Sequence, residues 1–207
     1  MELLPGINLR QRIQQDGHLA CDRALSIVRG VGAALTVAHQ RGLVHRDLKP
    51  ENIFLVEDRG RDLPKVLDFG LAKFVGEQQA DTRAATVDTG AGVLVGTPQY
   101  MSPEQLKGKP VAPGWDLWAM TIILYEMLTG AYPFGRHESV AALHDAILAA
   151  RFAPVDRHLP QAPLRWQEFF AHNLAADARR RATSAAEFLS SCEQTFGLEA
   201  AHAARIH

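Results

Sequence analysis

Apolar residues recur at helical spacing in one long stretch of the first half of this 207-residue chain and in most of its second half. Residues 22–40 show the pattern of an amphipathic helix that ends at Arg41 and Gly42. Residues 116–129 are apolar on nearly every face and stop at Gly130, as expected of a buried central helix. Further helical patterns, separated by prolines, cover residues 139–150, 164–175 and 184–196.

Patterns typical of β-strands are shorter and lie in the first third of the chain. Residues 53–56 and 65–67 are apolar runs that flank the polar stretch 57–62, which predicts a hairpin. Residues 1–4 form another short apolar run before the Pro5-Gly6 turn. The combined pattern predicts an α+β fold that is mainly helical and has short hairpins.

Composition and charge narrow the class of protein. A hydrophobic content of 47% allows one domain with a sizeable core, and a formal net charge of -1 gives no reason to expect nucleic acid or an anionic membrane as a partner. Cys21 and Cys192 are too far apart to suggest a disulfide framework or a metal site, which fits a reducing compartment. Residues 1–10 do not resemble a secretory signal, and the apolar stretch 117–128 contains Glu126 and is shorter than the ~20 residues of a membrane span. We therefore expect a cytoplasmic protein.

Candidate chemistry is concentrated between His45 and Asn52. A carboxylate (Asp47), an ammonium group (Lys49) and a carboxamide (Asn52) share one short loop, in which Pro50 limits the backbone freedom. Phosphoryl transfer needs an acceptor for the proton of the incoming hydroxyl, a cation beside the moving phosphoryl group and an oxygen ligand for Mg²⁺. The loop supplies all three kinds of group.

The spacing of His45-Arg46-Asp47 and Asn52 resembles the protein kinase catalytic loop. Asp68-Phe69-Gly70 matches the metal-binding motif of kinases, and residues 96–104 resemble the end of a kinase activation segment, with Ser102 where Ala is usual. The motifs follow one another in the kinase order. Lys49 and the Gly-Thr-Pro at 96–98 resemble the serine/threonine branch, in particular its bacterial members.

The resemblance implies a role for each residue of the catalytic centre, with ATP and Mg²⁺ as cofactors. Asp47 would orient the substrate hydroxyl and accept its proton, and Lys49 would stabilise charge on the γ-phosphate. Asn52 and Asp68, one at each foot of the predicted hairpin, would hold Mg²⁺. Thr97 would brace Asp47 and Lys49.

The resemblance also implies a nucleotide site at the start of the chain. Residues 1–8 would be the hinge that pairs with adenine; the alternative is an ordinary strand and turn. Phe54 would meet the adenine face, although a buried aromatic residue without a ligand role is an equal alternative. The residues assigned to cofactor binding are Glu2, Leu4, Asn8 (near the ribose), Lys49, Glu51, Asn52, Phe54 and Asp68.

A regulatory site is less well defined. Residues 71–95 are rich in small and polar side chains and should be mobile. We favour Thr89 as a phosphorylation site, with Arg46 as the nearest cation that could bind the phosphate. Many kinases carry this site four residues before the Thr of Gly-Thr-Pro, where Val93 stands in this chain.

Five charged residues also have structural interpretations. By resemblance, Asp116 would hold the backbone of the catalytic loop; a helix N-cap is the simpler alternative. Arg181 would pair with Glu104 in a buried ion pair. Glu51 and Glu126 could attract basic residues of a peptide substrate, but structural or solvated carboxylates are the safer interpretation.

The resemblance covers the hinge and the larger, C-terminal lobe of a kinase, with the N-terminal lobe absent. It divides the chain into a hinge remnant (1–8), the C-lobe (9–197) and a C-terminal tail (198–207). All five lysines lie at or after Lys49, so none can be the strand lysine that holds the α- and β-phosphates. We expect a partial serine/threonine kinase acting on protein substrates, with a separate N-lobe segment as a possible partner. The alternatives are a non-catalytic binding or scaffold module and a small-molecule phosphotransferase.

Overall fold

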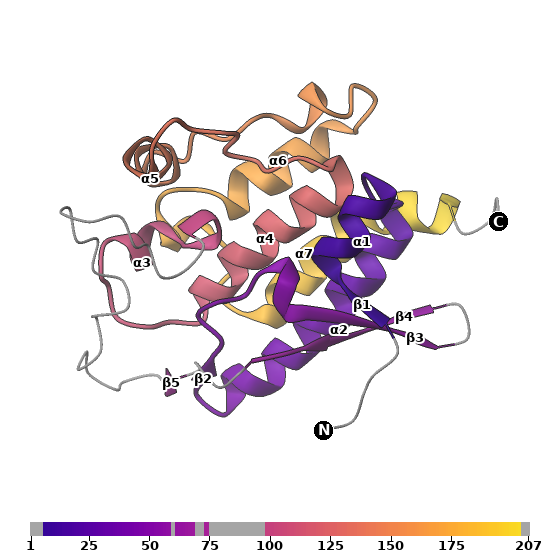
Figure 1. The fold of residues 1–207 in the computed structure, drawn as a ribbon, viewed down its shortest axis with the longest axis horizontal. Helices are drawn as coiled ribbons and strands as arrows, with labels where there is room; N and C mark the ends of the chain where they lie inside the picture. Colours follow the sequence, from indigo (N-terminus) through magenta and orange to yellow (C-terminus); the bar gives the residue numbers. More distant parts are fainter. Residues whose placement is uncertain (1–5, 59–60, 69–72, 75–97, 204–207) are drawn as a thin grey trace.

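The computed structural model describes residues 6–58, 61–68, 73–74 and 98–203. Helices dominate this part of the chain, and the strands form one small antiparallel sheet and one strand pair (Figure 1). The α-helices are α1 (Leu9–Asp16), α2 (Cys21–Gln40), α3 (Pro103–Leu106), α4 (Gly114–Thr129), α5 (Val140–Leu148), α6 (Leu164–Asn173) and α7 (Ala185–Ala203). The strands are β1 (Gly6–Asn8), β2 (Leu43–Val44), β3 (Ile53–Asp58), β4 (Arg61–Val66) and β5 (Lys73–Phe74). Short 3-10 helices are η1 (Pro50–Asn52), η4 (Pro98–Tyr100), η5 (Val155–Arg157) and η6 (Ala178–Arg180).

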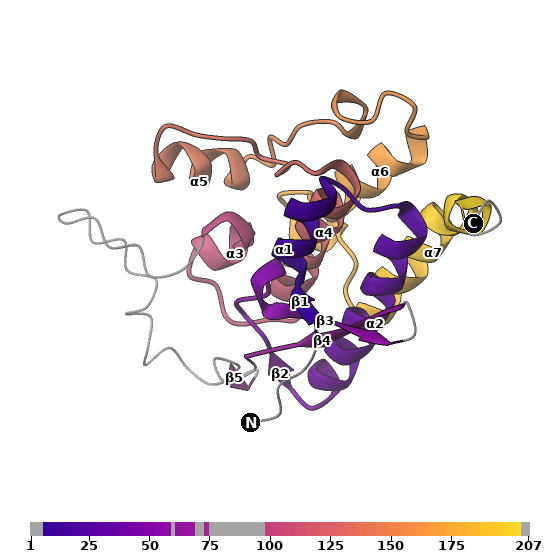
Figure 2. The ribbon, with the colours of Figure 1, turned by 45° about the vertical axis from the view of Figure 1, so that its right-hand side comes forward.

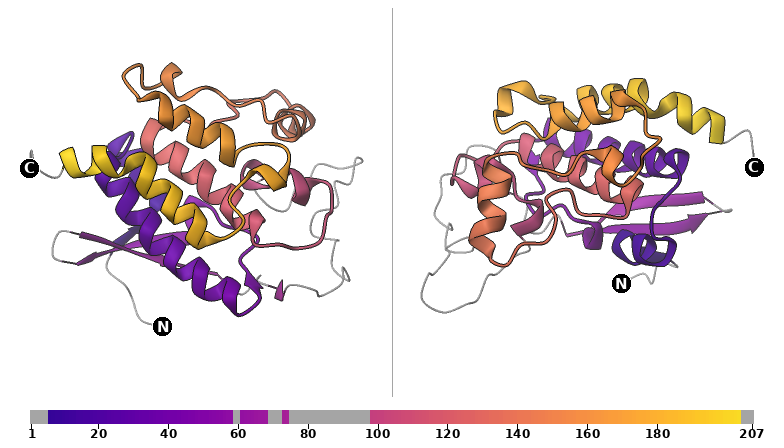
Figure 3. Two further views of the ribbon diagram at one scale, coloured as in Figure 1. Left: turned by 180° about the vertical axis from the view of Figure 1, so that it is seen from behind. Right: turned by 90° about the horizontal axis from the view of Figure 1, so that it is seen from above.

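Helix α4 is the centre of the core, as its sequence predicted. All of its residues from Trp115 to Leu128 are buried, and it ends at Gly130 in the left-handed conformation that glycine adopts readily. Helices α2 and α6 pack against α4, and α7 lies along α2 (Figure 3). Within the described residues, no helix is both long and apolar enough to cross a membrane.

The predicted hairpin is confirmed as β3 and β4, which pair antiparallel from Ile53 with Val66 outward. Strand β1 was not predicted; it adds to the free edge of β3, with Gly6 opposite Val56 and Asn8 opposite Phe54. Gly6 has a φ of 152°, and a Cβ atom at this position would lie 2.0 Å from the backbone oxygen of Leu55. The glycine that the sequence pattern assigned to a turn therefore lets two strands approach each other.

Helix α1 was also missed. It is 8 residues long and buries only Leu9 and Ile13, too few apolar positions for a clear period. A capping box fixes its start, because Asn8 accepts a hydrogen bond from the backbone N–H of Gln11 and the Gln11 side chain accepts one from the backbone N–H of Asn8. Helix α7 runs to Ala203, so the proposed boundary at 197/198 falls inside a helix.

Gly30 allows α2 to pack against β4. A Cβ atom at Gly30 would lie 2.4 Å from Cγ of Pro64, a rigid ring, whereas at Gly197 in α7 the nearest atom would be Oε2 of Glu193 at 3.7 Å. Replacing glycine with alanine in a helix normally stabilises it by about 1 kcal/mol. Overpacking costs about 1–3 kcal/mol, so we expect Gly30→Ala to lower the free energy of unfolding and Gly197→Ala to raise it.

Urea denaturation of the two variants tests this contrast. The expected difference between them is about 2 kcal/mol, with Gly30→Ala the less stable. Equal stabilisation by both substitutions would mean that Pro64 moves aside at no cost.

Candidate active site

The catalytic loop lies between β2 and η1 and brings together the three side chains that the sequence singled out. The Lys49 ammonium Nζ donates to the Asp47 carboxylate Oδ2 at 2.7 Å. The Asn52 amide Nδ2 donates to the Asp47 backbone oxygen at 2.8 Å and lies 3.4 Å from Asp47 Oδ2. The side chains of Asp47 and Lys49 are partly exposed (33% and 20%), so an acid–base pair faces solvent from a loop that Asn52 closes.

Asp68 follows β4, and a backbone hydrogen bond holds the residue before it next to Asn52. The Leu67 N–H donates to the Asn52 backbone oxygen at 2.8 Å, and the His45 ring Nε2 lies 2.8 Å from the Leu67 backbone oxygen. Asp68 has a φ of 58°, in the left-handed region that residues other than glycine seldom adopt. The hairpin therefore joins the two predicted metal ligands at its feet, as expected.

Asn52 and Asp68 offer amide and carboxylate oxygens, the type of ligand that Mg²⁺ prefers. The Asn52 amide nitrogen is held by the loop, and among the described residues neither the Asn52 amide oxygen nor the Asp68 carboxylate has a hydrogen-bond partner. Mg²⁺ binds one or two protein oxygen ligands together with phosphate oxygens and water. In the part of the chain that the structure describes, no cluster of three or more His, Cys, Asp or Glu residues could form a metal site made by the protein alone.

Asp116 in the first turn of α4 fixes the start of the catalytic loop, as the resemblance predicted. Its Oδ1 accepts from the Arg46 backbone N–H at 2.9 Å, and its Oδ2 accepts from the His45 backbone N–H at 2.9 Å. The His39 ring Nε2 lies 2.8 Å from the same Oδ2. The carboxylate is 1% exposed and makes no cap to its own helix, so the N-cap interpretation is wrong.

Residues 98–106 extend the site beyond the catalytic loop. Ser102 begins α3 with a capping box to Gln105, which gives the unusual serine a structural role. The Gln105 side chain Nε2 donates to the Arg46 backbone oxygen at 2.9 Å and so ties α3 to the catalytic loop. This part of the predicted activation segment is therefore held against the reactive residues.

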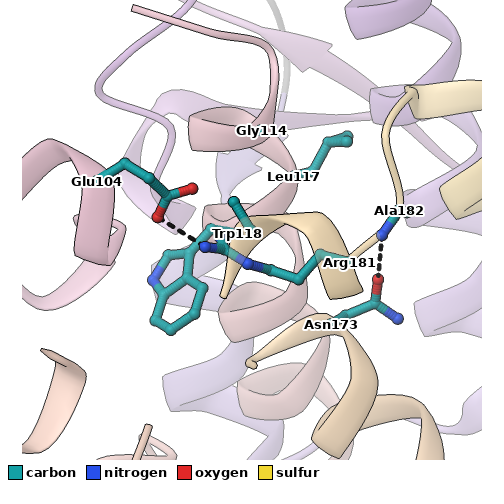
Figure 4. A pocket seen from close by; sticks show the side chains of 8 residues that line it. Glu104, Gly114, Leu117, Trp118, Asn173, Arg181 and Ala182 are labelled. Atoms are coloured by element: carbon teal, nitrogen blue, oxygen red, sulfur yellow. Dashed lines mark hydrogen bonds and ion pairs between the residues drawn. The ribbon is translucent and has the colours of Figure 1, made fainter. Parts of the chain in front are cut away.

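The ion pair between Arg181 and Glu104 is confirmed. Nη2 of Arg181 lies 2.7 Å from Oε2 of Glu104, and the guanidinium also stacks 4.9 Å from the centre of the Trp118 ring (Figure 4). These side chains line a cavity of about 20 Å³, about enough for one water molecule, together with Asn173, which accepts from the Ala182 N–H. The cluster anchors α3 and is not a ligand site.

A second charged cluster, around Arg10 in α1, was not predicted from the sequence. Arg10 donates to Glu51 (Nε to Oε1, 2.9 Å), to the buried Glu126 (Nη1 to Oε1, 3.3 Å) and to the Tyr100 hydroxyl. The Tyr100 hydroxyl in turn donates to Glu126 Oε2 at 2.6 Å. Burial raises the pKa of Glu126, opposed by the charge of Arg10 and by the hydrogen bond from Tyr100. Glu51 and Glu126 thus have the structural role that the sequence favoured.

Of the other predicted site residues, three are described by the structure and four are not. Asn8 and Phe54 are paired across β1 and β3, so two residues assigned to the nucleotide lie side by side, although the Asn8 side chain also caps α1. Arg46 has a buried Nε without a hydrogen-bond partner among the described residues. Glu2, Leu4, Thr89 and Thr97 lie outside the described residues.

Comparison with known proteins agrees with the site. Residues 1–194 match the family described as "Protein kinase domain". The probable serine/threonine-protein kinase PknB of Bifidobacterium longum is 37% identical over 188 residues, which are 91% of this chain and 26% of that protein. The serine/threonine-protein kinase PknB of Mycolicibacterium smegmatis is 36% identical (79% of this chain, 25% of that protein), and Pkn1 of Myxococcus xanthus is 44% identical (69% and 19%).

This chain therefore spans about a quarter of the length of these curated relatives. The match to the family nevertheless covers almost all of the chain, including the catalytic loop and the segments that hold it. The chain belongs to the protein kinase family and has bacterial serine/threonine kinases among its relatives.

Proposed function

We propose that the chain supplies the catalytic loop and the larger lobe of a serine/threonine protein kinase, which transfers the γ-phosphate of ATP to hydroxyl groups of proteins. The observation that carries this proposal is the contact of Asp47, Lys49 and Asn52 within one loop. Asn52 holds the loop through the Asp47 backbone oxygen, and the side chains of Asp47 and Lys49 stay partly exposed to solvent. Phosphoryl transfer needs all three polar groups together.

Each residue has a task that its position supports. Asp47 orients the substrate hydroxyl and accepts its proton, and Lys49, 2.7 Å from that carboxylate, stabilises charge on the moving phosphoryl group. Asn52 and Asp68 would hold Mg²⁺, which would neutralise charge on the phosphate oxygens. Thr97, by resemblance, braces Asp47 and Lys49.

In this proposal the nucleotide would lie beside the sheet. Phe54 on β3 and Asn8 at the end of β1 would contact the adenine and the ribose, and Glu2 and Leu4 would provide the hinge edge. Glu51 would lie next to the nucleotide while its side chain binds Arg10. An N-lobe would supply the remaining contacts to the phosphates, and the protein is proposed to act in the cytoplasm.

The test is transfer of labelled γ-phosphate from Mg-ATP to a generic Ser/Thr protein substrate. We expect Asp47→Asn to reduce the rate by at least about 100-fold, because the variant cannot accept the hydroxyl proton. Asp145→Asn, on the exposed side of α5, is the matched control and should leave the rate unchanged. Equal rates for Asp47→Asn and the unmodified chain would contradict the assignment of Asp47. Absence of transfer by both would mean that the chemistry needs an N-lobe, and that this chain alone is a fragment or a binding module.

A further inference from the structure

A groove with a volume of about 800 Å³ lies apart from the catalytic loop. Its walls come from η4, from the connection between α4 and α5, from the start of α5 and from η5. Helix α5 lies next to α3 (Figure 2) and contacts η4. Because Pro98 and Gln99 of η4 line the groove, it borders the end of the predicted activation segment. None of the residues assigned to ATP, Mg²⁺ or proton transfer lines it.

The groove is lined by basic side chains and by no carboxylate among the described residues. Arg136 and His137 approach from the α4–α5 connection, and Arg157 and His158 from η5. All four side chains belong to exposed residues. Arg136 and Arg157 form no ion pair within the part of the chain that the structure describes, whereas Arg10, Arg23, Arg29 and Arg181 each bind a carboxylate. The groove thus presents to one space two arginines that pair with no carboxylate of the described residues.

Two carboxylates are nearby in sequence. Glu138 follows His137, and Asp156 precedes Arg157, and both residues are exposed. Neither lines the groove and neither pairs with Arg136 or Arg157 among the described residues. They reduce the positive potential around the groove without filling it.

The floor of the groove is suited to a polypeptide. Tyr132 lines it and donates its hydroxyl proton to the Gln99 backbone oxygen at 2.5 Å, which fixes one wall against the other. Val140, which is 40% exposed, adds an apolar surface at the start of α5. An apolar side chain flanked by carboxylates would match both the floor and the charged rim.

We propose that this groove docks an acidic segment of the protein substrate, beside the segment that receives the phosphate. The proposal rests on the proposed kinase function, because Pro98 and Gln99 belong to the predicted peptide-binding segment and also line the groove. Arginines favour carboxylates by charge complementarity, and the effect is reduced by salt. Docking here would favour substrates that carry an acidic segment in addition to the phosphorylated Ser or Thr.

Binding can be measured without turnover, so this test can fail or succeed independently of catalysis. The probe is a fluorescent peptide with alternating Asp and Glu around one Leu and without Ser, Thr or Tyr, and its control is the same peptide with Asn and Gln. In low salt we expect the acidic peptide to bind the full chain, and Arg136→Gln/Arg157→Gln to weaken binding about tenfold. Arg180→Gln, an exposed arginine that does not line the groove, is the matched control and should bind normally.

A variant that is expected to bind more tightly serves as a further control, because misfolding would weaken binding and not strengthen it. Glu138→Gln should strengthen binding of the acidic peptide about two-fold, because it removes a repelling charge beside the groove. Equal binding of the acidic and amide peptides, or an unchanged affinity of the double arginine variant, would overturn the proposal. A single-stranded oligonucleotide of the same charge serves as a second probe. If it binds as tightly as the acidic peptide and the double arginine variant loses that binding too, the proposal is overturned in favour of a general anion site.

Discussion

Replacing Asp116 with alanine is expected to lower the free energy of unfolding by about 3–5 kcal/mol. The substitution removes the acceptor for the backbone N–H groups of His45 and Arg46 and for the His39 ring, in a place where water does not replace it. A buried donor without a partner costs about 1–3 kcal/mol, and hydrogen bonds to a charged acceptor are stronger than neutral ones. Asp116→Asn keeps one acceptor oxygen and should lose about half as much.

Urea denaturation followed by tryptophan fluorescence measures this loss, with Asp145→Ala as the exposed control that should change stability by less than about 0.5 kcal/mol. Hydrogen exchange gives a second signature, because the amide protons of His45 and Arg46 should exchange faster in Asp116→Asn. A role limited to helix capping would cost only about 0.5–2 kcal/mol and would leave these two amides protected. That result would contradict the assignment of Asp116 to the catalytic loop.

The parts of the fold that the sequence predicted are those whose signal is local. Helix α4 is apolar on nearly every face and α2 has a clear helical period, so their existence follows from the spacing of apolar residues. The hairpin of β3 and β4 follows from two apolar runs around a polar turn. The catalytic loop was predicted for the same reason, since Asp47, Lys49 and Asn52 are neighbours in sequence.

The parts that were missed depend on contacts between distant segments. Arg10 meets Glu51, Tyr100 and Glu126 across 41, 90 and 116 positions, and no local pattern encodes such pairs. Helix α1 has only two buried residues and is defined by its capping box, which the sequence does show once Asn8 and Gln11 are compared. Asp116 could be assigned to the catalytic loop only because the chain resembles a known family.

Removing the charge of Arg10 is expected to lower the free energy of unfolding about as much as replacing Asp116. Arg10→Met leaves Glu126 as a carboxylate whose side chain is 7% exposed, with the Tyr100 hydroxyl as its remaining partner. Breaking a buried ion pair by removing one partner costs about 3–5 kcal/mol, mostly because the other charge stays buried. The double variant Arg10→Met/Glu126→Gln removes that charge and keeps an acceptor for Tyr100, so it should recover most of the loss.

The pH dependence of the stability loss caused by Arg10→Met tests whether the buried charge of Glu126 is its source. Burial raises the pKa of Glu126 in the folded protein, so at a pH between its ordinary and its raised pKa the folded state binds more protons than the unfolded state. Stability contributed by this group therefore increases as the pH falls through the raised pKa and decreases as the pH rises. Removing Arg10 raises the pKa of Glu126 further, because the charge of Arg10 opposes the effect of burial.

The loss caused by Arg10→Met should thus be largest near pH 8 and smaller by at least about 1 kcal/mol near pH 5, where more of Glu126 is protonated. In the double variant the difference from the unmodified chain should depend less on pH, since Gln does not titrate. Urea denaturation of both variants at the two pH values measures these differences. A loss of the same size at both pH values, with no recovery in the double variant, would contradict this explanation. It would mean that Arg10 stabilises the fold through packing of its alkyl chain and its contact with Glu51. The Glu126 charge would then tolerate burial without Arg10.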